Sequence, residues 1–576
     1  MKKTGAALTV YALEQIGINY TFGIPGVHTT EIYDKLNTSE QIEPILVTHE
    51  GCASFMADAI SRTSDKIGTL VVVPAAGMTH AMSGIGEAYL DGIPMLIISG
   101  GTRRDTGKSY QLHQLDQEKV IGSIVKKYFL IKSQKDIVKT IYEAYDLANS
   151  GEPGPVFIEI PVEIQMFQEE VDELLEYKKP VLKNEMELSK IINAAKIISE
   201  SKKVGIYLGW GAVDTSEYSV KIAEMLNAPV ATTLQGLSSF PANNELHTGL
   251  GFGNNATPTG QKAFKNIDCL LAVGVRFSEL ATGSFGVDVP ENLIHIDINP
   301  EVFDKNYQSK VNIEGDAANV LKILYDELKN VELAANESNI KELIKSEKQK
   351  YFNSWLTNKS KEIVSPGFFF KSLREKLPKD VMIITDDGKH TFLTAELFPI
   401  YKPRHFISPT DFNSMGYCVP ATIGVKLANP NKKVVGIAGD GAFTMTGFEL
   451  ITAKTHKLGI IIFVFSDGEL GQISQFQKIP LKHKTATILG KLNLEGAAMA
   501  TGAHFVKIDN DFEIDEKIDE AIKISDEGQA VLVDVNIDYS RKTFLTKGVV
   551  KTNLLRFPLK EKIRFISRAL KRHTFG

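Results

Sequence analysis

Short runs of apolar and β-branched residues recur along this chain, and helical stretches separate each run from the next. Alternation of this kind predicts parallel sheets with helices on both faces. The runs fall into three sets: 45–48, 69–73, 95–99 and 156–160; then 204–208, 230–233, 270–273 and 293–298; then 381–385, 405–408, 434–438, 460–465 and 531–535. We therefore expect an α/β fold made of three doubly wound parallel-sheet domains.

Charged segments separate the three sets. Residues 168–190 read as a linker, and a Lys/Glu-rich helical stretch at 336–361 precedes the third set. The predicted domains are given by number as 1–167, 187–330 and 364–540, followed by a basic C-terminal tail at 541–576.

The tail contains eleven Lys and Arg residues but a single acidic residue, Glu561. Within it, Leu559, Ile563, Ile566 and Leu570 recur at helical spacing and form one apolar stripe among basic residues. Such a helix can make peripheral contact with an anionic membrane surface. We favour the alternative that it docks on the acidic body of its own dimer.

The remaining composition is that of a soluble protein, and we expect a cytoplasmic one. Hydrophobic residues make up 43% of the chain, and no uninterrupted apolar run is long enough to cross a bilayer. The chain starts with a predicted amphipathic helix instead of a signal peptide. Cys52, Cys269 and Cys418 lie far apart, so neither a disulfide framework nor a zinc site is predicted. No motif indicates nucleic-acid binding.

Two carboxylates follow two neighbouring strands of the third set. Gly439-Asp440-Gly441 comes after run 434–438, and Ser466-Asp467-Gly468 comes after run 460–465. In open parallel sheets ligands bind at the carboxyl ends of strands. Hard oxygen ligands beside exposed backbone N–H groups suit a magnesium ion that bridges a diphosphate. Taken alone, each tripeptide could equally be a turn.

The 27-residue spacing of Asp440 and Asp467 resembles the metal motif of thiamine diphosphate enzymes. In that family the second ligand is usually Asn preceded by another Asn, and here Ser466-Asp467 stands in that place. The resemblance implies that Asp440, Asp467 and the backbone carbonyl of Glu469 hold Mg²⁺. It also implies that Gly439, Gly441 and Ala442 lie against the diphosphate of the cofactor.

Two further segments match the same family. Met415-Gly416 followed by Val419-Pro420-Ala421 is similar to the stretch that supports the aminopyrimidine, although a buried Met is otherwise most often core. The resemblance implies that Met415 presses between the two rings and holds the cofactor bent. Gly388 and His390 occupy the Gly-x-His position near the diphosphate.

The first domain resembles the pyrimidine-binding domain of the acetolactate synthase group, through segments 22–26, 48–53, 75–80 and 88–94. A lone Glu50 would read as a carboxylate that stabilises a helix start. The resemblance implies instead that Glu50 hydrogen-bonds a pyrimidine nitrogen and so activates the cofactor. In that group the glutamate and the metal site meet across two subunits, which implies a homodimer or homotetramer.

The middle of the chain departs from the flavin-bearing synthases. Segments 232–236 and 274–277 match their FAD contacts, but Ser278-Glu279-Leu280 replaces the usual Asp-Asp-Arg. Gly209-Trp210-Gly211 is similar to a dinucleotide turn whose third glycine position is Asp214. Bound FAD therefore remains open.

Substrate positions also depart from the pattern. Phe476 stands where the anabolic synthases carry the Trp that favours 2-oxobutyrate, and His28 replaces a small residue. His113 and Gln114 cover the region of the active-site Gln. Two imidazoles near a nascent carbanion could transfer protons, and we therefore assign His28, His113 and Gln114 to catalysis together with Glu50. The alternative is that the histidines only satisfy loop ends.

These features predict a thiamine diphosphate-dependent carboligase and decarboxylase that acts on a 2-oxo acid such as pyruvate. One alternative is a lyase or hydrolase that uses the same cofactor on an acyloin or a 1,2-dione. A second is a non-catalytic regulatory homologue, against which Glu50, Met415, Asp440 and Asp467 argue together. The incomplete glycine fingerprint disfavours a nucleotide-dependent dehydrogenase.

Overall fold

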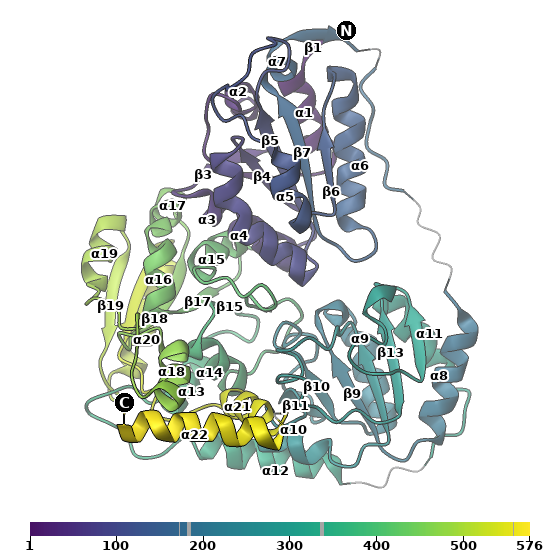
Figure 1. The fold of residues 1–576 in the computed structure, drawn as a ribbon, viewed down its shortest axis with the longest axis vertical. Coiled ribbons are helices and arrows are strands. Elements are labelled where there is room, and N and C mark those ends of the chain that lie inside the picture. Colours follow the sequence, from purple (N-terminus) through teal and green to yellow (C-terminus); the bar gives the residue numbers. More distant parts are fainter. Residues whose placement is uncertain (172, 181–185, 335–338, 557, 576) are drawn as a thin grey trace.

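Three parallel sheets of six strands each organise the chain (Figure 1). The computed structural model describes residues 1–171, 173–180, 186–334, 339–556 and 558–575. Every strand pair within the three sheets is parallel, and helices cover the sheets. The predicted α/β class with three doubly wound domains is thereby confirmed.

The first sheet has the strand order β3-β2-β4-β5-β7-β6. Its strands are β2 (Tyr20–Gly23), β3 (Glu43–Leu46), β4 (Gly68–Val72), β5 (Met95–Gly101), β6 (Lys127–Leu130) and β7 (Pro155–Pro161). Its helices are α1 (Gly5–Gln15), α2 (Thr30–Leu36), α3 (Glu50–Thr63), α4 (Ala76–Asp91), α5 (Gln117–Ile121), α6 (Ile137–Asn149) and α7 (Val162–Met166). A separate antiparallel pair joins β1 (Lys2–Thr4) to β8 (Gln168–Glu170), so part of the segment predicted as a linker pairs with the start of the chain.

The second sheet has the order β11-β10-β9-β12-β13-β14. Its strands are β9 (Val204–Leu208), β10 (Val230–Thr232), β11 (His247–Leu250), β12 (Cys269–Val273), β13 (Asn292–Asp297) and β14 (Val311–Glu314). Its helices are α8 (Leu188–Glu200), α9 (Ser216–Leu226), α10 (Pro258–Ala263) and α11 (Ala317–Leu328). Helix α12 (Ile340–Asn353) then leads to the third domain, with Ile344 in the second core and Tyr351 in the third.

The third sheet has the order β16-β15-β17-β18-β20-β19. Its strands are β15 (Met382–Thr385), β16 (Phe406–Ile407), β17 (Val434–Gly439), β18 (Ile460–Phe465), β19 (His504–Ile508) and β20 (Val531–Val535). Its helices are α13 (Pro366–Lys376), α14 (Lys389–Leu397), α15 (Cys418–Ala428), α16 (Asp440–Thr446), α17 (Leu450–Thr455), α18 (Gly471–Leu481), α19 (Leu494–Thr501) and α20 (Ile514–Asp526).

Helices α3 and α15 pack against each other and join the first and third domains. One apolar core runs from Phe22 in the first sheet through these helices to Ile462 in the third. All fourteen residues of α3 are buried, although Glu50 begins the helix and Arg62 lies near its end. The two domains predicted to hold opposite ends of a cofactor therefore share a core within this chain.

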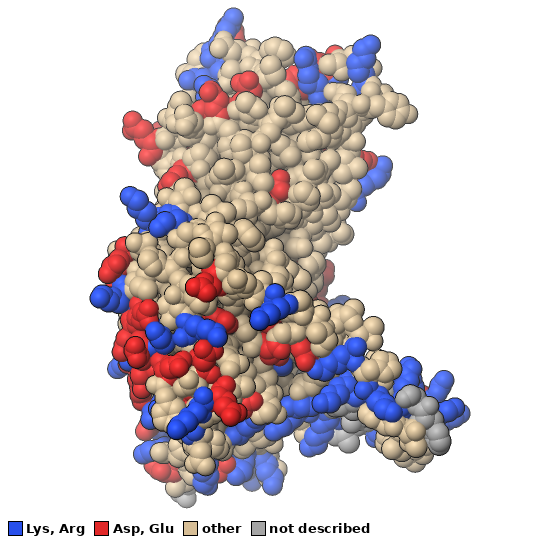
Figure 2. Space-filling view, turned by 90° about the vertical axis from the view of Figure 1, so that its left-hand side faces the viewer, with Lys and Arg blue, Asp and Glu red and all other residues tan. Residues whose placement is uncertain are grey.

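The tail folds into two helices, α21 (Phe544–Arg556) and α22 (Leu559–Phe575). The predicted apolar stripe on α22 is exposed, with Leu559 74% and Leu570 61% accessible. Figure 2 shows Lys and Arg side chains gathered on the lobe at its lower right, where the chain ends. Within the described residues, no helix is both long enough and apolar enough to traverse a bilayer. The three cysteines are free and buried.

Candidate active site

The carboxyl ends of β15, β17 and β18 lie side by side at one edge of the third sheet, because these strands are neighbours. The chain turns directly after each strand into the segments that begin at Asp386, Asp440 and Ser466. Seven predicted site residues follow these strands within a few positions: Gly388, His390, Asp440, Gly441, Ala442, Asp467 and Glu469. The topology thus brings together residues that are up to 81 positions apart.

Asp440 is the centre of this cluster. It is only 5% exposed, and Gly468 N donates to its Oδ2 at 2.7 Å while Gly441 N donates to its Oδ1 at 2.8 Å. Burial raises the pKa of Asp440, although these backbone donors favour its charged form. A buried carboxylate with its backbone bonds in place is preorganised to accept a cation.

Asp467 faces a cation in this structure. The Lys389 ammonium forms an ion pair with Asp467 Oδ2, and the same ammonium lies 4.0 Å from the ring centroid of Tyr539. The backbone N–H of Asp467 also donates to Asp440 Oδ2 at 3.2 Å, which joins the Asp440 carboxylate to the backbone that carries Asp467. The side chain of Glu469 instead pairs with Lys484, so its backbone carbonyl is the group left for a ligand role.

The donors in this cluster fit a magnesium ion. Within the described residues, no group of three or more His, Cys, Asp and Glu side chains is placed to hold a metal. Asp440 and Asp467 with one backbone carbonyl would leave other positions of an octahedral ion to water or phosphate oxygens. Mg²⁺ is commonly bound in this way.

His390 and Gly388 complete the turn next to Asp440. His390 is 3% exposed, its Nε2 has no partner among the described residues, and burial lowers its pKa to about 3. A Cβ built on Gly439 would lie 3.2 Å from His390 Nδ1, so the imidazole rests against the strand end. Gly388 has a φ of +149°, and a Cβ there would come within 2.8 Å of the His390 ring. Glycine is therefore required at 388.

Met415 lies beside the same turn. A Cβ on Gly441 would come within 3.8 Å of Met415 Cε, so the predicted wedge and the predicted metal site are adjacent. Asp386 fixes the segment around Met415, because its two oxygens accept from Gly416 N and Cys418 N, both at 2.8 Å. Burial raises the pKa of Asp386 to about 7.

Glu50 lies at the corresponding edge of the first sheet, as the first residue of α3. It is 6% exposed, and its Oε2 lies 3.0 Å from His80 Nδ1. A Cβ on Gly77 would stand 2.9 Å from Val73 Cγ2 and 3.0 Å from Glu50 Oε1, so glycine at 77 lets the carboxylate lie close to the backbone of α4. Within the part of the chain that the structure describes, Glu50 is hydrogen-bonded to His80 and to no residue of the Asp440 cluster.

The structure brings the predicted pair His28 and His113 together. Their rings stack with centroids 5.1 Å apart, and both Nδ1 atoms lack partners among the described residues. Burial lowers the pKa of His28, and His113 adds to this effect. Gln114 is exposed and its Oε1 accepts from Gln111 N at 2.9 Å, so it bonds within its own loop.

Phe476, the predicted specificity position, lies on α18 and is 38% exposed.

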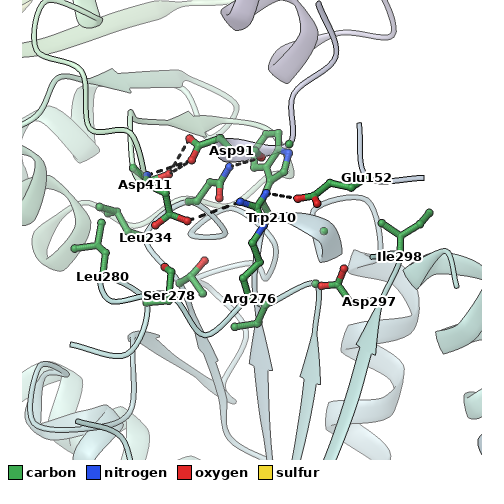
Figure 3. Close-up of a pocket in the computed structure, with 18 of the residues that line it drawn as sticks. Asp91, Glu152, Trp210, Leu234, Arg276, Ser278, Leu280, Asp297, Ile298 and Asp411 are labelled. Carbon is green, nitrogen blue, oxygen red and sulfur yellow. Dashed lines mark hydrogen bonds and ion pairs between the residues drawn. The ribbon is translucent and has the colours of Figure 1, made fainter. Parts of the chain in front are cut away.

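Segments 232–236 and 274–277, which match the FAD contacts of the flavin-bearing synthases, both line a cavity formed by all three domains (Figure 3). The cavity measures about 90 Å³, which is room for a handful of water molecules. Arg276 extends across it to Glu152 at 2.6 Å and toward Asp411 at 3.9 Å. Trp210 lines the same cavity, with the Arg62 and Arg404 guanidinium groups each 5.7 Å from its ring.

These side chains do not fit a flavin dinucleotide. Four carboxylates line the cavity around the single Arg276, those of Asp91, Glu152, Asp297 and Asp411. A diphosphate placed among them would meet like charges, and the volume is far below that of a dinucleotide site.

The Asp440 cluster in the third domain and the surroundings of Glu50 in the first domain form two half-sites. Together with the fold they define a class: three-domain α/β proteins that hold a diphosphate cofactor between two related domains. Three family models match the chain in order. They are the N-terminal TPP binding domain of thiamine pyrophosphate enzymes at residues 3–120, the central domain at 191–324 and the C-terminal TPP binding domain at 386–535.

Similar proteins cover almost the whole chain. The acetolactate synthase large subunit of Buchnera aphidicola is 32% identical over 94% of this chain and 96% of its own length. That of Haemophilus influenzae is 30% identical over 97% and 100% of the two chains. The probable acetolactate synthase large subunit of Methanocaldococcus jannaschii is 31% identical over 93% and 92%. The chain therefore belongs to the thiamine pyrophosphate enzyme family, and the three relatives named above are acetolactate synthase large subunits, one of them a probable one.

Some residues of the two half-sites were not predicted from the sequence: Lys389, Asp386, Tyr539, His80 and Glu449. The last accepts from Thr48 N at 3.0 Å across the interface of the first and third domains. Lys389 could have been found, because it lies between the predicted Gly388 and His390. The others depend on contacts between segments far apart in the chain.

Proposed function

We propose that this protein is a thiamine diphosphate- and Mg²⁺-dependent carboligase that decarboxylates a 2-oxo acid such as pyruvate. The acyl unit that remains would then be joined to a second carbonyl compound. The observation that carries the proposal is the convergence of His390, Met415, Asp440 and Asp467 at one sheet edge, with Glu50 buried at the edge of a second sheet. The names of the relatives support the same reaction.

Each residue would have a separate task. Asp440, Asp467 and the Glu469 carbonyl would hold Mg²⁺ against a diphosphate, and backbone N–H groups at the start of α16 would face the phosphate oxygens. Met415 would hold the two rings of the cofactor in a bent arrangement. Glu50 would hold a proton at a pyrimidine nitrogen. Thiamine diphosphate, when bound, supplies the nucleophilic carbon and the electron sink for decarboxylation.

His28 and His113 are proposed to transfer protons to and from the substrate. A neutral imidazole accepts a proton, and burial favours the neutral form of His28. Both Nδ1 atoms are buried without a partner among the described residues, so no neighbouring group fixes the proton of either ring there. This pair is also the observation that favours the second candidate function, cleavage of an acyloin or a 1,2-dione, because cleavage requires a proton to be removed from a hydroxyl or water.

A dimer is proposed as the working unit. Exposed apolar side chains border both half-sites: Leu46 is 63% accessible, and Met445 and Phe448 are each 59% accessible. Met445 lies beside Gly416, and the carbonyl of Leu46 accepts from Thr452 of α17. An apolar surface shared by two domains next to a site is typical of a subunit interface.

The reaction can be identified with purified protein, thiamine diphosphate, Mg²⁺ and pyruvate. We expect release of carbon dioxide and formation of acetolactate. Acetaldehyde as the sole product would replace the carboligase by a simple decarboxylase. Absence of carbon dioxide, together with cleavage of acetoin or a 1,2-dione, would favour the second candidate.

A further inference from the structure

A second cavity lies where the middle domain meets the third domain, and none of the reactions above uses it. It measures about 390 Å³, within the range of small-molecule sites. Its walls come from β11, α10, α12, α13 and α14. Most of its surface is apolar, contributed by Leu237, Leu250, Tyr351, Phe352, Phe370, Leu397, Phe398 and Ile400.

One cationic group stands inside this apolar wall without a counter-ion. Lys348 Nζ donates to His247 Nδ1 at 3.0 Å and to Ala242 O at 3.3 Å. Within the described residues, no carboxylate lies within ion-pair distance of Lys348. Burial lowers the pKa of Lys348 to about 8, so the ammonium is still mainly charged at neutral pH.

His247 lines the same cavity and is hydrogen-bonded to Lys348. Because Lys348 donates to its Nδ1, the proton of the neutral imidazole is on Nε2. Burial lowers the pKa of His247 well below its usual value, which keeps the ring neutral. The residue is 6% exposed, and Nε2 has no partner among the described residues. His247 therefore acts as a neutral acceptor that positions the Lys348 ammonium.

A third group has the same character. Thr259 lines the cavity, is 1% exposed, and its hydroxyl also lacks a partner in the described part of the chain. The His247 Nε2 and Thr259 Oγ1 atoms are themselves buried, so Lys348 is the donor that we expect to meet a ligand. Arg374 also lines the cavity, as do the carboxylates of Glu375 and Glu396, and Glu396 already accepts from Tyr351 and from Leu545 N. An anion with oxygen acceptors complements the Lys348 ammonium.

We propose that this cavity binds a small monocarboxylate with an apolar body. The carboxylate would pair with Lys348, whose ammonium His247 Nδ1 holds in place, while the body would lie on Phe370 and Phe398. Lys348 compensates one negative charge and the Glu396 carboxylate lines the same cavity, so a phosphate dianion would leave an uncompensated charge in apolar surroundings. The site is independent of the function proposed above.

The cavity is also connected to the candidate active site. Helix α14 begins at Lys389 and His390 and ends at Glu396 and Leu397, which line the cavity. Lys389 and Glu396 are seven positions apart, which corresponds to about 10 Å of helix. A ligand in the cavity would therefore contact the C-terminal end of α14. The first residue of this helix, Lys389, pairs with Asp467.

The test is calorimetric titration of the full-length protein with 3-phenylpropionate as the probe. We expect saturable binding that is at least tenfold weaker in Lys348→Met and in His247→Phe, which keeps the ring stacked on Phe240. Lys345→Met is the matched control, because Lys345 is exposed on the same helix, and its affinity should equal that of the wild type.

The neutral analogue 3-phenylpropionamide separates charge recognition from apolar contact and should bind at least tenfold more weakly than the acid. The proposal is overturned if the acid shows no saturable binding, if Lys348→Met binds it as well as the wild type does, or if the amide binds equally well. Circular dichroism of both variants checks that the loss is not one of folding.

Discussion

At the scale of single residues, the candidate metal site differs from its family in one ligand. Asp467 stands where an Asn is usual, and Lys389 pairs with it. Asp467→Asn restores the usual amide oxygen and removes one negative charge, so we expect the Mg²⁺ requirement to change only a few-fold. Asp440→Asn weakens the buried ligand that the backbone preorganises, and we expect at least a tenfold higher Mg²⁺ requirement.

The measurement is thiamine diphosphate binding as a function of Mg²⁺ concentration, followed by quenching of protein fluorescence. An equal rise of the Mg²⁺ requirement in Asp467→Asn and Asp440→Asn would contradict the prediction that Asp440 is the more important ligand.

Lys348 gives a pH prediction. Its pKa of about 8 in the folded protein lies below the ordinary value of 10.5. Between these values the unfolded chain binds more protons, so the contribution of this group to folding stability rises with pH. The charged lysine costs about 3 kcal/mol at pH 7, of which about 2 kcal/mol is recovered by pH 9.5.

Replacing Lys348 by Met removes this cost. We expect Lys348→Met to melt at a higher temperature than the wild type at pH 7, with the difference shrinking toward pH 9.5. Parallel melting curves of the two proteins across this range, with Lys345→Met as the control, test it. A difference that does not change with pH would rule out titration of Lys348 as the cause.

At the scale of elements, buried charges tie α3 and α4 to the segment before Met415. Arg62 is fully buried and pairs with Asp58 at 2.7 Å and with Asp91 at 2.8 Å. Asp91 also accepts from Thr410 at 2.7 Å, and Tyr417 donates to Asp58 at 2.6 Å. The helix that presents Glu50 and the segment that presents Met415 are therefore held by one network.

Arg62→Met leaves two buried carboxylates without their cation. We expect a loss of about 3–5 kcal/mol of stability, seen as a melting temperature lower by many degrees. Arg103→Met, which removes a partly exposed ion pair with Asp105, should melt close to the wild type. Similar melting temperatures for both variants would contradict the role given to the buried network.

The same scale shows what the sequence could and could not predict. Most interior strands can be predicted because both faces are buried and their residues are almost all apolar, as in β12 and β18. The runs do not include the short interior strand β2 or the edge strands β6, β11, β14 and β19. Residues such as His504 and Lys507 in β19 interrupt the apolar pattern, because an edge strand pairs on one side only.

The residues of the candidate site differ in the same way in how far the sequence predicts them. Asp440 and Asp467 directly follow interior strands and could be placed from spacing. His80 against Glu50 and Trp210 inside the three-domain cavity could not, since each depends on how separate elements pack. The stacking of His28 on His113 likewise joins loops that are 85 positions apart.

At the scale of the whole molecule, the exposed residues around the half-sites predict a dimer. Met445→Glu or Phe448→Glu would bury a charge in the proposed interface, so we expect the dimer to dissociate at micromolar concentration and activity to fall with it. Phe512→Glu, at a comparably exposed phenylalanine outside the surface that borders the half-sites, is the control. Sedimentation velocity measures the state of each variant. Dimers that persist in both Met445→Glu and Phe448→Glu would exclude this surface.

The central claim is that Glu50 activates a thiamine cofactor held at Asp440. Its most direct test is the rate of carbon dioxide release from pyruvate by wild type and Glu50→Gln, each saturated with thiamine diphosphate and Mg²⁺. The account predicts a rate at least about a hundredfold lower in Glu50→Gln while the cofactor remains bound. A variant that keeps the wild-type rate would contradict it.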